Sequence, residues 1–217
     1  SSHPVCLSQN TKDKRLRSSV KIDFDNYTYI IDCGPDFRQQ MINCNCKKID
    51  GILFTHEHAD HTAGLDDIRP FCFRNGALPV FGHKRVLDNL SNRFSYIFKK
   101  DNKYPGAPTV ISNHIEPNSH LNLNKFKVVP ISYLHADLQV YGYRFENFAY
   151  LTDLKTIEDN EIKKLKPSQG GEIHITDAIK SLIFKGSNFF GNIFEGKYLD
   201  CGTMNGYINS GKKINNL

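Results

Sequence analysis

The sequence predicts an α/β fold, because short apolar segments typical of strands alternate with segments of helical spacing up to about Lys166. Residues 18–34 ("SSVKIDFDNYTYIIDCG") alternate apolar and polar side chains on both sides of Asp25-Asn26, which predicts a β-hairpin. Residues 49–55 ("IDGILFT") form a compact apolar run of strand length, typical of a buried strand. We therefore expect a sheet whose strands are joined partly by helices.

The other elements follow from the same periodicities. Further strands are expected at residues 78–82, 125–133, 138–146 and 148–153. Helices or helical turns are expected at residues 36–42, 63–73, 84–98 and 156–166. Residues 101–124 are rich in Pro, Asn, Gly and Ser, which predicts a long loop.

Composition limits the class of protein. The 217 residues are 39% hydrophobic and 24% charged, which is typical of one good-sized globular domain or two small ones. No apolar run approaches the roughly 18 residues that span a bilayer, so no membrane partner is expected. The spacing of the six cysteines suggests no disulfide framework, and reduced thiols in the cytoplasm are the simplest account. The net charge of +5 favours an anionic substrate without demonstrating one.

A short loop concentrates metal-binding side chains after the strand predicted at 49–55. The sequence "THEHADH" holds three histidines and one aspartate: His56, His58, Asp60 and His61. On a tight loop His56 and His58 can reach one metal, while Asp60 and His61 can turn to a second. Imidazole nitrogens and carboxylate oxygens suit Zn²⁺, Mn²⁺ or Fe²⁺.

Four side chains cannot complete two metal sites, so later strands must supply further ligands. His135 follows the strand at 125–133, and Asp153 ends the strand at 148–153, where its carboxylate could bridge two metals. Asp32 ends the first hairpin and could orient a histidine. An aspartate after a strand is also often only a cap or turn residue. Two metals sharing a water would lower its pKa and make hydroxide available near neutral pH.

The loop and several further motifs resemble the metallo-β-lactamase superfamily. "KDKRLRSS", "IDCGPDFRQQM", "THEHADHTAGLDDIRPF", "YPGAP", "YGYRF" and "FAYLTDLKTI" together resemble its phosphodiesterase-like branch, over about residues 1–166. That branch is near the cyclic phosphodiesterase of phosphonate breakdown and, more distantly, the tRNA 3′-processing endonucleases. The resemblance implies an α/β fold of the αβ/βα sandwich type, with the site at one edge of two packed sheets.

The resemblance also implies roles for individual residues. One metal would take His56, His58 and His135, and the other would take Asp60 and His61, with Asp153 as the bridge. Asp60 and Asp32 are the candidate catalytic residues. The implied cofactors are two divalent metals, Zn²⁺ first, with Mn²⁺ or Fe²⁺ as alternatives. The implied reaction is hydrolysis of a small-molecule or nucleotide phosphodiester by a metal-bound hydroxide, and nucleic acid as substrate stays open.

Two arginines and the C-terminal segment carry further expectations. Arg15 and Arg17, in "KRLRSS", either meet substrate phosphate or form structural ion pairs. Residues 167–214 resemble the end of UTP–glucose-1-phosphate uridylyltransferases, whose "TDA" motif would place Asp177 near an active site. We therefore expect a sandwich domain at 1–166 that is incomplete at both ends, and an unrelated uridylyltransferase-like fragment at 167–217. The alternatives to a hydrolase are a fragment related to that transferase and a non-catalytic chimeric protein.

Overall fold

The computed structural model describes residues 4–99, 101–145 and 148–154. The helix expected at 156–166 and the segment at 167–217, with Asp177, lie outside these described residues. No helix in the described ranges is long and apolar enough to cross a membrane.

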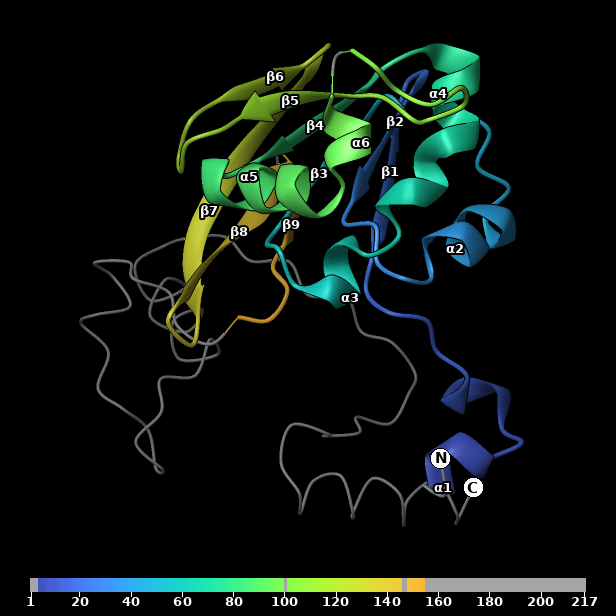
Figure 1. Cartoon of the computed structure of the whole chain (residues 1–217). Helices are drawn as coiled ribbons and strands as arrows, with labels where there is room; N and C mark the ends of the chain where they lie inside the picture. Colours follow the sequence, from blue (N-terminus) through green and yellow to red (C-terminus); the bar gives the residue numbers. More distant parts are fainter. Residues whose placement is uncertain (1–3, 100, 146–147, 155–217) are drawn as a thin grey trace, which may run out of the picture. The chain divides into compact units, whose positions relative to one another are not determined.

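The first sheet has five strands, and four of them run parallel. The predicted hairpin is confirmed, because β1 and β2 pair antiparallel around the turn at Asp25-Asn26. The strand order is β1-β2-β3-β4-β5, and β2 to β5 are parallel (Figure 1). The bounds are β1 Val20–Phe24, β2 Tyr27–Ile31, β3 Gly51–Leu53, β4 Leu78–Gly82 and β5 Val110–His114. Since parallel strands share a direction, β2, β3 and β4 end at one common edge of the sheet.

The second sheet is antiparallel throughout, in the order β6-β7-β8-β9. The bounds are β6 Leu121–Leu123, β7 Phe126–His135, β8 Leu138–Phe145 and β9 Phe148–Tyr150. The long β7–β8 hairpin closes at the register pair His135–Leu138. The three strands expected in this part of the chain are confirmed.

Apart from α1 and η1, which precede β1, the helices of the described part connect strands of the first sheet. The bounds are α1 Pro4–Leu7, η1 Thr11–Asp13, α2 Phe37–Asn43, α3 Ala59–Thr62, η2 Leu65–Ile68, α4 Arg69–Asn75, α5 Lys84–Arg93 and α6 Ser95–Phe98. The His83 side chain caps the start of α5 by accepting a hydrogen bond from the Arg85 backbone N–H. The single helix expected at 84–98 is two helices, because the backbone leaves helical geometry at Phe94 (φ −119°, ψ 45°).

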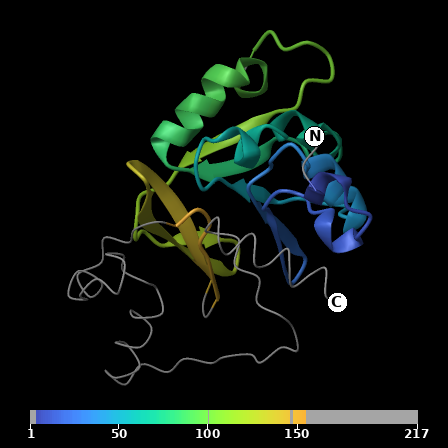
Figure 2. The ribbon, with the colours of Figure 1, turned by 90° about the horizontal axis from the view of Figure 1, so that it is seen from below.

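Two apolar cores lie on opposite faces of the first sheet. Alternate residues of β2 serve both, as in any strand covered on two sides: Ile30 packs with the helices, while Ile31 packs against the second sheet. Figure 2 shows the helices on one face of the first sheet and the second sheet on the other. The described residues thus form helix, sheet and sheet layers of the expected sandwich.

The prediction of one long loop at residues 101–124 is wrong, because the segment contains β5 and β6. β5 is an edge strand, and of its five residues only Val110 is buried. An edge strand can carry polar side chains on its exposed faces without energetic cost. The Asn- and Ser-containing sequence of β5 therefore lacks the apolar pattern by which a buried strand is recognised.

Candidate metal centre

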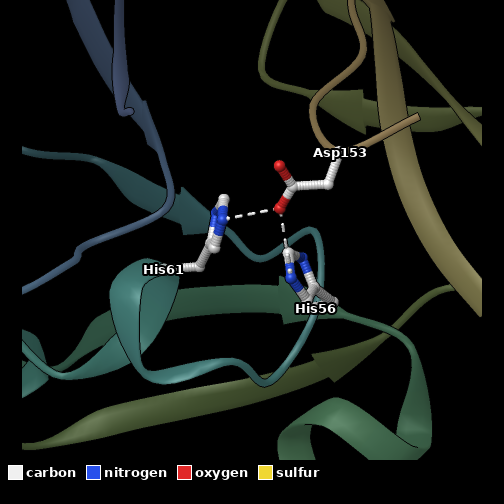
Figure 3. A group of neighbouring side chains, drawn as sticks. All are labelled: His56, His61 and Asp153. Atoms are coloured by element: carbon white, nitrogen blue, oxygen red, sulfur yellow. Dashed lines mark ion pairs between the residues drawn. The ribbon is translucent and has the colours of Figure 1, made fainter. Parts of the chain in front are cut away.

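The predicted ligands come from strand ends of both sheets. Asp32 directly follows β2, and the loop with His56 follows β3 at the same edge. On the second sheet His135 is the last residue of β7, and Asp153 lies three residues after β9. Figure 3 shows Asp153 reaching His56 and His61 from the opposite side. Packing of the two sheets therefore assembles the group.

The backbone of the loop is held against the segment that follows β2. Asp60 and His61 belong to the short helix α3, and the Cys33 N–H donates to the His61 carbonyl at 2.9 Å. A Cβ atom at Gly34 would collide with the carbonyl oxygen of Asp60. Glycine at position 34 is thus required for this close approach, which fixes α3 beside Asp32.

Three side chains form the tightest cluster. Asp153 Oδ2 lies 3.0 Å from His61 Nε2 and 3.5 Å from His56 Nε2 (Figure 3). Their potential ligand atoms all lie within 4.8 Å of one another. Both histidines are buried, whereas the Asp153 side chain is 35% exposed. One carboxylate oxygen therefore faces two imidazole nitrogens, an arrangement suited to a shared position between two cations.

The remaining predicted ligands border this cluster. The His58 ring centroid lies 4.6 Å from that of His56, and the His135 ring lies 6.0 Å from His56 and 5.7 Å from His58. His135 Nδ1 is buried and has no hydrogen-bond partner among the described residues. Asp60 Oδ2 lies 3.5 Å from His61 Nε2, with its side chain 58% exposed.

Asp32 sets the orientation and the tautomer of His61. Its carboxylate is buried and accepts from Thr55 N–H at 2.9 Å, Thr55 Oγ1 at 2.7 Å and His61 Nδ1 at 2.7 Å. Burial raises the pKa of Asp32. Burial by itself would lower the pKa of His61, but the hydrogen bond to Asp32 and the nearby carboxylates outweigh it, so the pKa of His61 is raised. With its proton on Nδ1, His61 directs Nε2 toward Asp153.

His56 is kept neutral by its surroundings. Burial, followed by the neighbouring His61 and His58, lowers the pKa of His56 to about 3. A neutral imidazole keeps a lone pair for a metal. The donor set of imidazole nitrogens and carboxylate oxygens, together with the orphaned His135 Nδ1, fits divalent metals of the Zn²⁺ type.

Comparison with known proteins assigns the family. A family model described as "Beta-lactamase superfamily domain" matches residues 27–175. The chain belongs to the metallo-β-lactamase superfamily. A crystal structure described as a new diphosphatase from the PhnP family has a TM-score of 0.67 at 31% identity, covering 85% of this chain and 74% of that one.

Curated relatives of this superfamily member carry different names. A Porphyromonas gingivalis protein named octanoyltransferase is 39% identical over 163 residues, which are 75% of this chain and 33% of that protein. A ribonuclease Z of Thermoplasma volcanium is 23% identical over 205 residues, which are 92% of this chain and 60% of that protein. The chain thus spans about a third of the first relative, so an activity of that whole protein does not transfer to it.

The structure also places side chains that the motifs of the superfamily did not reveal. The Tyr133 hydroxyl donates to the Thr152 carbonyl at 2.6 Å and accepts from the Thr152 N–H at 3.0 Å, which holds the segment that carries Asp153. One signal was present in the sequence: Tyr133 lies two residues before His135 in a strand, so both share a face.

The contacts of Arg17 support the ion-pair alternative. Its Nη1 lies 3.1 and 3.0 Å from the two carboxylate oxygens of Asp36, and its N–H donates to Asp36 at 2.8 Å. The guanidinium therefore forms a structural ion pair. Arg15 is exposed.

Proposed function

We propose that the chain is a two-metal hydrolase of phosphodiesters. The observation that carries the proposal is the position of the Asp153 carboxylate oxygen between His61 and His56. One metal would be held by His56, His58 and His135, and the other by Asp60 and His61, with Asp153 shared between them. This is the assignment implied by the sequence resemblance, and the ring and carboxylate positions support it. Zn²⁺ is the proposed metal, with Mn²⁺ or Fe²⁺ as alternatives.

Such a metal pair supplies positive charge at a phosphoryl centre and a water of lowered pKa. The protein's own residues prepare the site for this. Asp32 holds the proton at His61 Nδ1, so that Nε2 is free to bind. Asp32 is buried beneath His61 and acts by positioning it. Asp60 is the more exposed carboxylate of the loop, and we propose it as the group that accepts a proton from the attacking water.

The proposed substrate class is a small-molecule or nucleotide phosphodiester. Similarity to the PhnP-family diphosphatase favours phosphorus chemistry over amide or thioester hydrolysis. The same similarity makes a diphosphate the second candidate substrate. A phosphodiester and a diphosphate are both hydrolysed at a P–O bond that links two larger groups. Nucleic acid as substrate has only the more distant ribonuclease Z similarity in its favour. Location in the cytoplasm stays a prediction.

The test combines metal content with turnover. Purified wild-type protein is expected to carry about two metals per chain and to hydrolyse bis(4-nitrophenyl) phosphate, while Asp153→Asn loses most of both. Asp36→Asn, which changes a carboxylate paired with Arg17, is the matched control and should keep both. The rate with a dinucleoside diphosphate, measured in parallel, shows whether the enzyme prefers a diphosphate or a phosphodiester linkage. A folded wild-type sample with neither metal nor turnover would count against the proposal.

The two alternatives from the C-terminal segment need a separate measurement. Titration with UTP should not raise the melting temperature if residues 167–217 provide no nucleotide site, whereas clear stabilisation would favour the transferase-related alternative. A sharp unfolding transition with two bound metals would contradict the non-catalytic chimera.

A further inference from the structure

One arginine connects the metal-binding loop to the second sheet. Arg85, in the first turn of α5, forms an ion pair with Glu57: Nη2 donates a hydrogen bond to Oε2 at 3.1 Å, and Nε lies 2.9 Å from Oε1 without the geometry of a hydrogen bond. Arg85 Nη2 also donates to the backbone carbonyl of Gln139 at 2.6 Å. Glu57 belongs to the loop that follows β3 of the first sheet, and Gln139 belongs to β8 of the second sheet. The Arg85 guanidinium therefore contacts elements that carry candidate metal ligands in both sheets.

The two contact points of Arg85 lie beside metal ligands. Glu57 stands between His56 and His58 in the loop. Gln139 pairs with Leu134 in the β7–β8 ladder, directly before the register pair that contains His135. Arg85 therefore ties the histidines of the first sheet to the hairpin tip that carries the histidine of the second.

His135, which is partly buried, depends on this contact more than the buried His56 and His61 do. The His61 ring is hydrogen-bonded to Asp32, and His56 Nδ1 lies 3.0 Å from Thr55 Oγ1. His135 Nδ1, by contrast, has no hydrogen-bond partner among the described residues. The placement of its ring thus rests on the position of its backbone, which the Arg85–Gln139 hydrogen bond helps to fix.

Arginine suits this set of contacts better than lysine does. A planar guanidinium can engage both oxygens of a carboxylate and still direct an N–H at a carbonyl, whereas a lysine ammonium is a point charge on a flexible stem. The Glu57 side chain is only 16% exposed, so removal of Arg85 would leave a poorly solvated negative charge within the loop.

We propose that Arg85 is a positioning residue of the metal centre, which acts by holding His135 in reach of the metal shared with His56 and His58. This inference rests on the proposed function, because it presupposes that the six side chains bind metal.

Metal affinity of the apo-protein is the direct readout. Zn²⁺ is titrated into full-length protein in competition with a chromogenic chelator, which resolves the affinities of the two metals. Arg85→Met should weaken one of them by about 10- to 100-fold, the range typical of residues that orient a ligand, and leave the other nearly unchanged. Arg85→Lys should restore part of the loss. Arg69→Met is the control, since Arg69 contacts Asp66 and Tyr104, which both lie outside the metal-binding loop and β8.

A double-mutant cycle shows whether Arg85 acts through His135. Arg85→Met made in an His135→Ala background should cost much less than it does alone, because the ligand that it positions is already gone. An equal cost in both backgrounds, or unchanged affinity in Arg85→Met, would overturn the inference while the proposed function stands. Wild-type protein that binds no Zn²⁺ would overturn both. If Arg85→Met does not fold, Glu57→Gln tests the same tie from its other end and should weaken the same metal.

Discussion

Asp32→Asn is the sharpest perturbation of the centre, because it changes a proton position with almost no change in shape. The amide oxygen can still accept from the Thr55 N–H, which bonds Oδ1 in the structure. The amide nitrogen then replaces Oδ2 and faces His61 Nδ1. Since an amide nitrogen only donates, His61 must accept at Nδ1 and carry its proton on Nε2. The Nε2 lone pair, which points toward Asp153, is then protonated and cannot bind a metal.

The magnitude follows from the bond that is lost. A hydrogen bond to a charged group contributes about 1.5–3 kcal/mol. At 1.4 kcal/mol per factor of ten, the metal on His61 should bind about 10- to 100-fold more weakly, which agrees with the range of about 10- to 100-fold measured when such supporting carboxylates are changed. The metal proposed to bind His56, His58 and His135 should be affected much less.

The assay is the chelator competition titration with Zn²⁺, supported by nitrogen-15 NMR of the imidazole rings, which reports the tautomer. Asp36→Asn is the control, because it makes the same chemical change to a carboxylate outside the centre. Two metals bound to Asp32→Asn with wild-type affinities, or a His61 ring that keeps its proton on Nδ1, would refute the reasoning.

Two further predictions concern stability. Tyr133→Phe removes both hydrogen bonds to Thr152, so the free energy of unfolding should fall by about 1–3 kcal/mol and the metal content should drop. Tyr29→Phe is the control, because the Tyr29 hydroxyl bonds to Asn124, and it should lower stability without metal loss. Equal metal loss in the two variants would contradict this role of Tyr133. Because burial and neighbouring histidines lower the pKa of His56 to about 3 from 6.5, the unfolded chain binds more protons between these pH values. Metal-free protein should therefore lose stability as the pH falls from 6.5, by up to about 1.4 kcal/mol per pH unit from this group, and denaturation of His56→Gln at pH 5 and 7 should show a smaller dependence.

Local patterns predicted most of the elements that position the centre. The alternation in residues 18–34 predicted β1 and β2, and the apolar run at 49–55 predicted β3, because strand periodicity and burial are written in neighbouring residues. The same reasoning failed for β5, an edge strand whose exposed positions need no apolar side chain. Phe94, where one expected helix becomes two, shows a similar limit of local pattern.

The candidate metal-binding side chains were also predicted from the sequence, and the structure brings His56, His61 and Asp153 together. A cluster of three histidines and an aspartate in one loop has few uses besides metal binding, and the strand ends at His135 and Asp153 were the places from which further ligands could come. Chemistry of this kind depends on residue type and on short spacing, and both are visible without coordinates.

Only the tertiary structure decided how these side chains are held. Arg85 meets Glu57 across 28 positions and Gln139 across 54, and the Tyr143 hydroxyl donates to the Phe54 carbonyl across 89. Hydrogen bonds between such distant segments cannot be predicted from local sequence patterns, because they form only when the helices and sheets have packed together. That packing brings the Asp153 carboxylate of the second sheet to His56 and His61 of the first.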